Sequence, residues 1–263
     1  MTLRVLNLYA GIGGNRKLWS GDIEVTAVEI NPEIAKIYQD FFPQDKMVVG
    51  DAHQFLLEHF KEFDFIWASP PCQTHSKMRY LASKRGSYDA KLPDMSLYQQ
   101  ILFLQHFCKD KKWVVENVVP YYEPLIKPTT KLDRHLFWSN FPIQEKSFDK
   151  PDIKHNKVTG KTDRYGINLN GIKLEHRKDQ IIRNCVNPEL GKYILDSAMA
   201  KTTFTIKGLS KDHPAQRDFN EFMQKQMEVK SGCDANDDGI PPNNKLLGIL
   251  PNELWKLEIS CCR

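Results

Sequence analysis

The 263-residue chain lacks several features that would place it in familiar protein classes. It has no run of 18 apolar residues, so we expect no membrane-spanning helix. Its first eight residues do not form the long apolar stretch of a signal peptide, and no internal repeat is visible. Its six cysteines form no Cys-x-x-Cys pair, which favours free thiols in a reducing cytoplasm. These absences predict a cytoplasmic protein.

The length and charge of the chain suggest one main domain with a basic surface. A chain of this length can form one full domain and a small second lobe. The net charge is only +4, but residues 73–183 carry 21 Lys and Arg against 12 Asp and Glu. A basic segment between less basic ends indicates a face that meets phosphates, although a merely solvated basic surface is the alternative.

The first 72 residues alternate apolar strand patterns with helical ones. This alternation predicts an α/β fold with a parallel sheet covered on both faces. The expected strands are Val5–Tyr9, Ile23–Ile30, Met47–Val49 and Phe63–Ala68, and the expected helices are Asn15–Trp19, Pro32–Phe42 and Phe55–Phe60.

Beyond residue 72 the pattern is less regular. Residues 73–95 are polar and basic and predict a long mobile loop. Further on we expect helices at Leu97–Cys108 and Pro188–Ala200, and strands at Trp113–Val115 and His135–Trp138. Residues 201–263 form an extension of unknown role.

Polar residues and glycines follow the first three predicted strands. A glycine turn at 11–14 would let the backbone approach a ligand closely. Glu29 ends the second strand, where an acid can accept hydrogen bonds from ribose hydroxyls, and Asp51 follows the third, where it could accept one from an adenine amino group. Each acid alone is more often a surface residue, but the three features together predict an adenosine-containing cofactor.

The fourth and fifth strands end in residues suited to covalent chemistry. Two prolines, Pro70 and Pro71, fix a rigid turn that carries Cys72. A thiol held there is placed as a nucleophile, although a buried structural thiol is the common alternative. Glu116 and Asn117 close the fifth strand, where a carboxyl group beside an amide suits recognition and protonation of a ring nitrogen.

On these residues the chain resembles the cytosine-C5 DNA methyltransferases of bacterial or phage type. The matching motifs are the glycine turn from Tyr9, the run Ser69–Gln73, the Glu-Asn-Val run from Glu116 and part of an arginine motif around Arg134. The last family motif resembles 183–188, with Arg183 in place of the usual glycine. The chain departs from the family pattern at three further points. Tyr9 replaces the usual phenylalanine, and the arginine motif has only Arg134 where the family usually has two arginines. The family's motif rich in Arg, Leu and Gln is not found in residues 165–182.

The resemblance implies a Rossmann-like sheet that binds S-adenosyl-L-methionine. It implies that Cys72 adds as a thiolate to C6 of cytosine, that Glu116 holds N3, that Arg134 contacts O2 and that Asn117 positions the cysteine loop. We therefore expect the site to lower the Cys72 pKa, and we expect no metal. The cofactor residues implied are Tyr9, Ala10, Gly11, Ile12, Gly13, Gly14, Glu29, Ile30, Asp51, Ala52, Pro70, Asn184 and Val186.

The same resemblance implies a flipped-out cytosine in double-stranded DNA as the substrate. The expected nucleic-acid contacts are Gln73, Ser76, Lys77, Arg79, Lys84 and Arg85. The expected domains are a catalytic domain at 1–138, a small target-recognition lobe at 139–182, a returning catalytic segment at 183–200 and the extension. We expect a nucleoid-associated monomer, with a cognate restriction endonuclease as a candidate partner. The alternatives are a tRNA cytosine-C5 methyltransferase and a catalytically silent DNA-binding relative.

Overall fold

The computed structural model describes residues 2–148, 167, 169, 172, 174–175, 178–200, 204–206, 217–218, 220–221 and 259–261. By contacts the chain divides into two units, 1–199 and 200–263. The second unit contains the antiparallel pair β8 (Phe204–Ile206) and β9 (Ile259–Cys261). Most of the expected recognition lobe and of the C-terminal extension lies outside the described residues.

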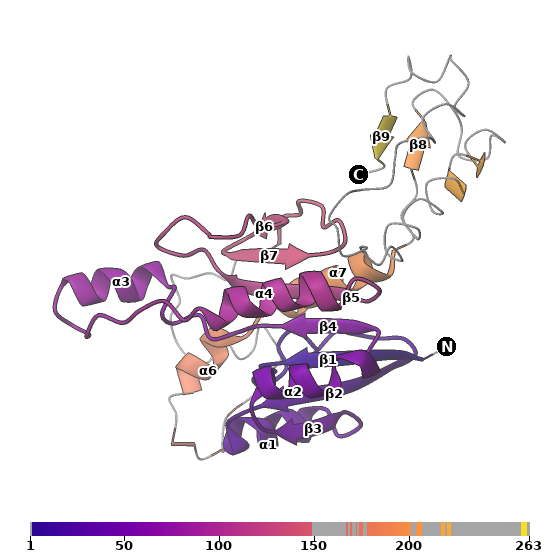
Figure 1. The fold of residues 1–263 in the computed structure, drawn as a ribbon. Helices are drawn as coiled ribbons and strands as arrows, with labels where there is room; N and C mark the ends of the chain where they lie inside the picture. Colours follow the sequence, from indigo (N-terminus) through magenta and orange to yellow (C-terminus); the bar gives the residue numbers. More distant parts are fainter. Residues whose placement is uncertain are drawn as a thin grey trace. The chain divides into compact units, whose positions relative to one another are not determined.

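The first unit is built on a seven-stranded sheet in the order β3-β2-β1-β4-β5-β7-β6 (Figure 1). Neighbours from β3 to β5 are parallel, whereas β7 runs antiparallel to both β5 and β6. The predicted parallel sheet is therefore correct for five strands, and the sheet as a whole is mixed. The strands are β1 (Leu3–Leu8), β2 (Ile23–Glu29), β3 (Lys46–Val49), β4 (Phe65–Ala68), β5 (Lys112–Val118), β6 (Thr130–Leu132) and β7 (His135–Ser139).

Helices cover both faces of this sheet because the central strands are apolar on both sides. Leu6, Leu8 and Ile66 pack with residues of α2 and α4, while Val5 and Trp67 pack on the opposite face with residues of α7. This is a Rossmann-like α/β arrangement. The helical segments are α1 (Pro32–Phe41), α2 (Ala52–His59), the 3-10 turn η1 (Phe60–Glu62), α3 (Lys77–Lys84), α4 (Ser96–Phe107), α6 (Lys178–Asn184) and α7 (Pro188–Met199).

The helix expected at Asn15–Trp19 is absent, and these residues form successive turns. Buried contacts hold them in that form. Asn15 and Asn7 exchange side-chain hydrogen bonds of 2.8 and 3.4 Å, and Trp19 Nε1 donates to the carbonyl of Gly191 at 3.0 Å. The glycine turn is therefore not followed by a helix N-terminus that could favour an anionic ligand.

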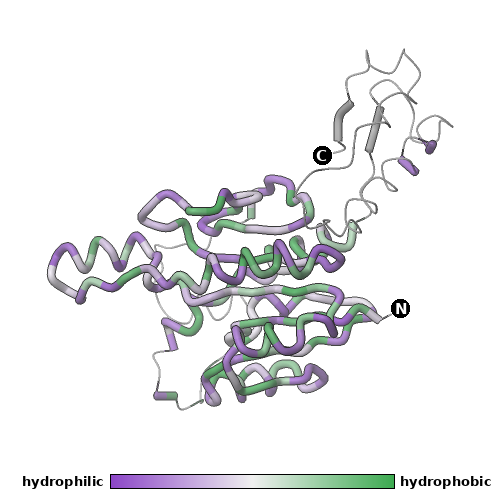
Figure 2. Tube along the Cα trace, in the orientation of Figure 1, coloured by the Kyte–Doolittle hydropathy of each residue, from purple (hydrophilic) through white to green (hydrophobic). Residues whose placement is uncertain are grey.

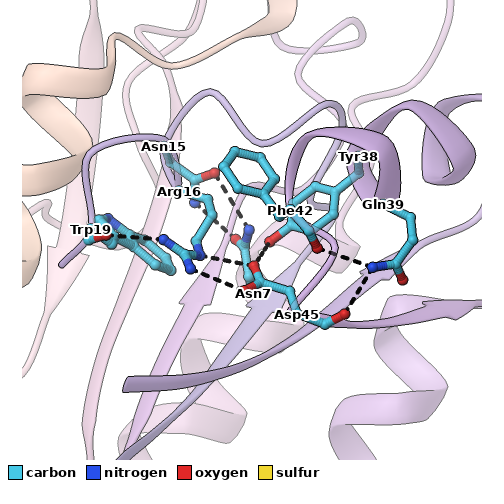
Figure 3. Close-up of polar contacts among 8 residues, drawn as sticks. All are labelled: Asn7, Asn15, Arg16, Trp19, Tyr38, Gln39, Phe42 and Asp45. Carbon is cyan, nitrogen blue, oxygen red and sulfur yellow. Dashed lines mark hydrogen bonds and ion pairs between the residues drawn. The ribbon is translucent and has the colours of Figure 1, made fainter. Parts of the chain in front are cut away.

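A polar network fixes this irregular segment to the loop between α1 and β3 (Figure 3). Arg16 makes a two-pronged ion pair with Asp45, at 2.8 and 2.9 Å, and both side chains are largely buried. Tyr38 donates its hydroxyl to the same carboxylate at 2.8 Å. Tertiary contacts thus replace helical hydrogen bonds as the local source of order.

The segment 73–95, expected to be a mobile loop, contains the eight-residue helix α3. Ser76 pairs with Pro120 in an isolated bridge, and Tyr121 N donates to the His75 carbonyl at 3.1 Å. The base of the segment is therefore attached to the chain that follows β5. Along α3 hydrophobic residues stand among hydrophilic ones (Figure 2), and none of its side chains is buried. The loop was expected from the polar and basic composition of the segment, which does not exclude an exposed helix.

Candidate active site

Most of the predicted cofactor and catalytic residues follow the carboxyl ends of strands β1 to β5. These strands are parallel neighbours, so their carboxyl ends share one edge of the sheet. Ligands of open α/β sheets bind at such an edge. The expected cofactor and catalytic residues are thus brought to one region of the fold.

Glu29 organises the glycine turn from the end of β2. Its carboxylate accepts hydrogen bonds from Gly11 N and from Asn31 N, each at 3.0 Å. The φ angle of Gly11 is +55°, and a Cβ at that position would meet no atom within 4 Å. The turn therefore leaves open space above its backbone, while each Glu29 oxygen keeps a second lone pair for a ligand hydroxyl.

Ile30 and Asp51 lie beside this turn and differ in their roles. Ile30 is 68% exposed, so an apolar surface lies beside the turn. Asp51 caps α2, with Oδ1 accepting from His53 N and Gln54 N at 2.7 and 3.1 Å. The sequence indicated Asp51 as a ligand contact only, and the structure gives it a helix-capping role as well.

The returning segment closes the other side of the glycine turn. Gly14 lies so close to Val186 that a Cβ on Gly14 would be 2.7 Å from the Val186 carbonyl oxygen. Asn184 ends α6 and is exposed, whereas Val186 is buried. Ala10, Ile12, Gly13 and Ala52 are also buried, so the turn contributes mainly backbone to any ligand site.

Tyr9, which replaces a phenylalanine of the family motif, has a polar partner. Gln100 Nε2 donates to the Tyr9 hydroxyl oxygen, and His53 Nδ1 lies 3.4 Å from the same amide nitrogen. Burial raises the pKa of Tyr9 to about 12, so the hydroxyl stays protonated. No sequence pattern pointed to Gln100, which lies in the middle of α4 and is fully buried.

Cys72 is held on a turn that β5 supports. Asn117 Nδ2 donates to the Pro70 carbonyl at 3.0 Å, and the Cys72 carbonyl accepts from His75 N at 3.1 Å. The thiol itself is partly exposed, unlike Cys108 and Cys185, which are buried. Asn117 therefore contacts the cysteine turn directly.

The expected low pKa of Cys72 is wrong for this structure. Burial, together with the charge of Glu116, raises the pKa of the Cys72 thiol to about 11, while the charge of Arg134 lowers it. The thiol is therefore neutral near pH 7 in this structure.

Arg134 precedes β7 and follows Asp133, which has a φ angle of +52°. Its Nη2 donates to the Arg183 carbonyl at 2.9 Å, and the residue is exposed. This bond links the arginine motif to the end of α6. The guanidinium keeps further donors for a substrate.

The structure adds a residue that the sequence did not identify as functional. His135 begins β7, and its Nε2 lies 3.5 Å from Glu116 Oε1. Both residues are buried, at 6% and 7% exposure. The only hint was its place in the arginine motif, directly after Arg134.

Residues 73–95, which contain α3 and are called the α3 segment below, carry a basic and aromatic surface. This surface lies next to the cysteine turn, residues 69–73. Tyr80 and Tyr121 stack with centroids 4.4 Å apart, and Lys84 Nζ lies 5.0 Å from the Tyr80 ring centre. A cavity of about 250 Å³ opens here, lined by Thr74, Arg79, Tyr80, Ser83, Lys84, Ala90, Lys91 and Tyr121. None of these lining residues is acidic.

Of the expected nucleic-acid contacts, Gln73, Lys77, Lys84 and Arg85 are exposed and Ser76 and Arg79 are partly exposed.

The described residues contain neither a metal-ligand cluster nor a membrane-spanning helix. In the described part of the chain, no three His, Cys, Asp or Glu residues are grouped as metal ligands. None of the described helices is long and apolar enough to cross a membrane.

Comparisons with known proteins find similarity over the part of the chain that contains most of these residues. Residues 3–119 match the family model of the C-5 cytosine-specific DNA methylases. A human tRNA (cytosine(38)-C(5))-methyltransferase is 34% identical over 82 residues, which are 29% of this chain and 21% of that protein. The type II methyltransferase M.HgiCII of Herpetosiphon aurantiacus is 28% identical over 123 residues, 46% and 27% of the two chains.

The matched segment is short relative to these curated relatives, of whose lengths this chain spans about a fifth to a quarter. Among solved structures, a Spodoptera frugiperda DNMT2 mutant is 26% identical, with a TM-score of 0.34, over 44% of this chain and 36% of that one. The family match covers β1 to β5 and includes both the cysteine turn and the Glu-Asn-Val run. Over residues 3–119, this chain is similar to the cytosine-C5 methyltransferase family.

Proposed function

We propose that the protein is a DNA cytosine-C5 methyltransferase that uses S-adenosyl-L-methionine and a covalent bond from Cys72. The observation that carries the proposal is the cysteine turn held by Asn117, with the charges of Glu116 and Arg134 both acting on the thiol. The fold alone, without these side chains, would support only the proposal that the protein binds the cofactor.

The residues at the ends of β1, β2 and β3 fit S-adenosyl-L-methionine, which supplies the methyl group when bound. Glu29 would accept the ribose hydroxyls, the exposed Ile30 would cover one face of the adenine, and Asp51 has one oxygen not used in capping α2. The open space above Gly11 would admit the rest of the molecule. Asn184 and Val186 would border this space from the returning segment.

We assign the methylation of the target cytosine to four side chains. The Cys72 thiol loses its proton to water and Sγ adds to C6 of cytosine, while the protonated Glu116 carboxyl group donates its proton to N3, so that C5 becomes nucleophilic. Arg134 donates to O2 and Asn117 keeps the cysteine turn in place. After methyl transfer to C5, the C5 proton passes to water, the Sγ–C6 bond breaks, the C5–C6 double bond is restored, and N3 returns its proton to Glu116.

DNA is the substrate that we favour. The base must leave the stack to reach Cys72, which costs a few kcal/mol. The exposed cations of the α3 segment, together with the cavity beside them, would bind the surrounding phosphates. The family model and the similarity to a type II DNA methyltransferase support this choice.

A tRNA substrate is the second candidate. Two of the curated relatives, at 33% and 34% identity, are tRNA (cytosine(38)-C(5))-methyltransferases. Phosphate contacts alone do not distinguish DNA from RNA, because both backbones carry the same charge per nucleotide. The distinction requires measurement with both substrates.

Radiolabelled S-adenosyl-L-methionine, incubated with double-stranded DNA or tRNA in parallel, tests the proposal. We expect the wild-type protein to label DNA, and Cys72→Ala to abolish labelling while keeping nucleic-acid affinity. Oligonucleotides containing 5-fluorocytosine should trap the wild-type protein and leave this variant free. Labelling by Cys72→Ala would contradict the covalent mechanism, and labelling of tRNA alone would make RNA the substrate.

A further inference from the structure

His135 and Glu116 lie on the same face of the sheet although they come from different strands. In the antiparallel pairing of β5 with β7, Glu116 is opposite Phe137 and Val118 is opposite His135. The two polar residues are therefore diagonal neighbours. Their separation of 3.5 Å between Nε2 and Oε1 is longer than an ordinary hydrogen bond. Contacts between catalytic groups are often long before substrate binds and shorten in the complex.

The environment of His135 determines which ring nitrogen carries the hydrogen. Burial lowers the His135 pKa, with Arg134 acting in the same direction and Glu116 and Asp133 opposing it. The ring is therefore neutral near pH 7 and has one N–H. Among the described residues Nδ1 is buried without a hydrogen-bond partner, whereas Nε2 faces the Glu116 carboxyl group. The hydrogen belongs on Nε2, the nitrogen that has an acceptor in reach.

A position that served only to pack the core would not be expected to hold a buried histidine with an unpaired ring nitrogen. A buried imidazole with an unpaired nitrogen costs free energy that an apolar side chain of similar size would avoid. The neighbours of His135 along β7, Leu136 and Phe137, are buried apolar residues of the kind that would fit. The histidine therefore needs an explanation outside packing, and the polar group that its ring approaches is the Glu116 carboxyl.

We propose that His135 is a positioning residue that holds Glu116 Oε1 through its Nε2–H, so that Oε2, which carries the proton of the protonated carboxyl group, can donate it to N3 of the target cytosine. The inference rests on the proposed function, because it assigns Glu116 to the base. A carboxyl group with one oxygen fixed cannot rotate away from the ring. His135 also lies directly after the one arginine of the motif, so β7 and the residue before it supply two adjacent side chains to the site.

The test compares His135→Gln with His135→Asn. The Gln amide nitrogen reaches about as far as imidazole Nε2, whereas the Asn amide nitrogen corresponds to Nδ1 and falls short of Glu116. We expect His135→Gln to keep most of the wild-type kcat and His135→Asn to lose up to about 100-fold, as a small misplacement of a catalytic group can cost. The KM for the nucleic acid should remain unchanged, because the α3 cations are not altered.

A double-mutant cycle separates positioning from general structure. In a Glu116→Gln background, His135→Asn should cost little further activity, since the group that it positions has already been replaced. Melting temperatures of all variants report folding independently of activity. Equal activity of the Gln and Asn variants, or a full additional loss in the Glu116→Gln background, would overturn the inference. A wild-type protein that methylates neither DNA nor tRNA would instead overturn the proposed function, and the inference with it.

Discussion

The Cys72 thiol is protonated in the free protein, and its reactivity is therefore set by pH. With a pKa of about 11, raised by burial and by Glu116, the thiolate fraction increases about tenfold for each pH unit from 7 to 9. Alkylation of Cys72 by iodoacetamide, followed by peptide mass spectrometry, should increase with the same slope. Cys108 and Cys185 are buried, with pKa values raised to about 12, and serve as internal controls that stay unlabelled.

Two substitutions should change that reactivity in opposite directions. Glu116→Gln removes a negative charge that raises the Cys72 pKa, so alkylation at pH 8 should become faster. Arg134→Gln removes a positive charge that lowers it, so alkylation should become slower. A pH-independent rate in the wild-type protein, or a shift of both variants in the same direction, would show that these charges do not govern the thiol.

At the scale of elements, the irregular segment after β1 depends on the carboxylate of Asp45. Asp45→Ala leaves the Arg16 guanidinium buried without its ion pair and Tyr38 without its acceptor. We expect a loss of about 3 kcal/mol in the free energy of unfolding, measured by urea denaturation. Asp40→Ala, which breaks an exposed pair with Lys36, is the matched control and should cost under about 0.5 kcal/mol. Equal effects would mean that the buried network does not stabilise the turn.

The elements that the sequence predicted correctly are those with buried, periodic apolar residues. Strands β1, β2 and β4 and helices α1, α4 and α7 were expected within a few residues of their bounds. The missed elements depend on partners distant in the chain. Asn15–Trp19 is held by Gly191 and Asp45 rather than by its own helical bonds, and α3 lacks a buried face.

The same distinction applies to the candidate site. Cys72, Glu116 and Glu29 could be identified because each stands where a strand ends and carries reactive or ligand-binding chemistry. His135 and Gln100 could not, because their significance lies in contacts between strands and helices, and a histidine in an apolar strand gives no local signal. The direction of the Cys72 pKa was missed for a related reason, since burial of the thiol depends on the whole site.

At the scale of the whole molecule, the uneven distribution of charged residues along the chain should govern nucleic-acid affinity. Residues 73–183 carry a clear excess of Lys and Arg, and the α3 segment exposes several of them. Replacing Lys77, Lys84 and Arg85 by Ala should weaken binding of DNA at all sequences. The slope of log affinity against log salt should decrease by up to about 0.9 for each phosphate that the variant no longer neutralises.

The matched control replaces Lys36 and Lys192, which form exposed pairs within their own helices, α1 and α7. Fluorescence anisotropy with a labelled duplex, over a several-fold range of salt concentration, would give both slopes. An unchanged slope in the α3 variant, or an equal decrease in the control, would place the phosphate-binding cations elsewhere.

The bond from Trp19 to the Gly191 carbonyl joins residues 172 positions apart, and Val186 lies against Gly14. During synthesis on a ribosome, the first strand and its turn emerge long before the residues that cover them. The indole of Trp19 contacts Phe65 and Trp67 of β4 as well, but its side that packs against α7 must remain uncovered until α7 has left the exit tunnel. Nascent chains arrested before α7 has been synthesised should therefore be sensitive to protease around Trp19. Those extended far enough beyond Met199 for α7 to clear the tunnel should resist cleavage.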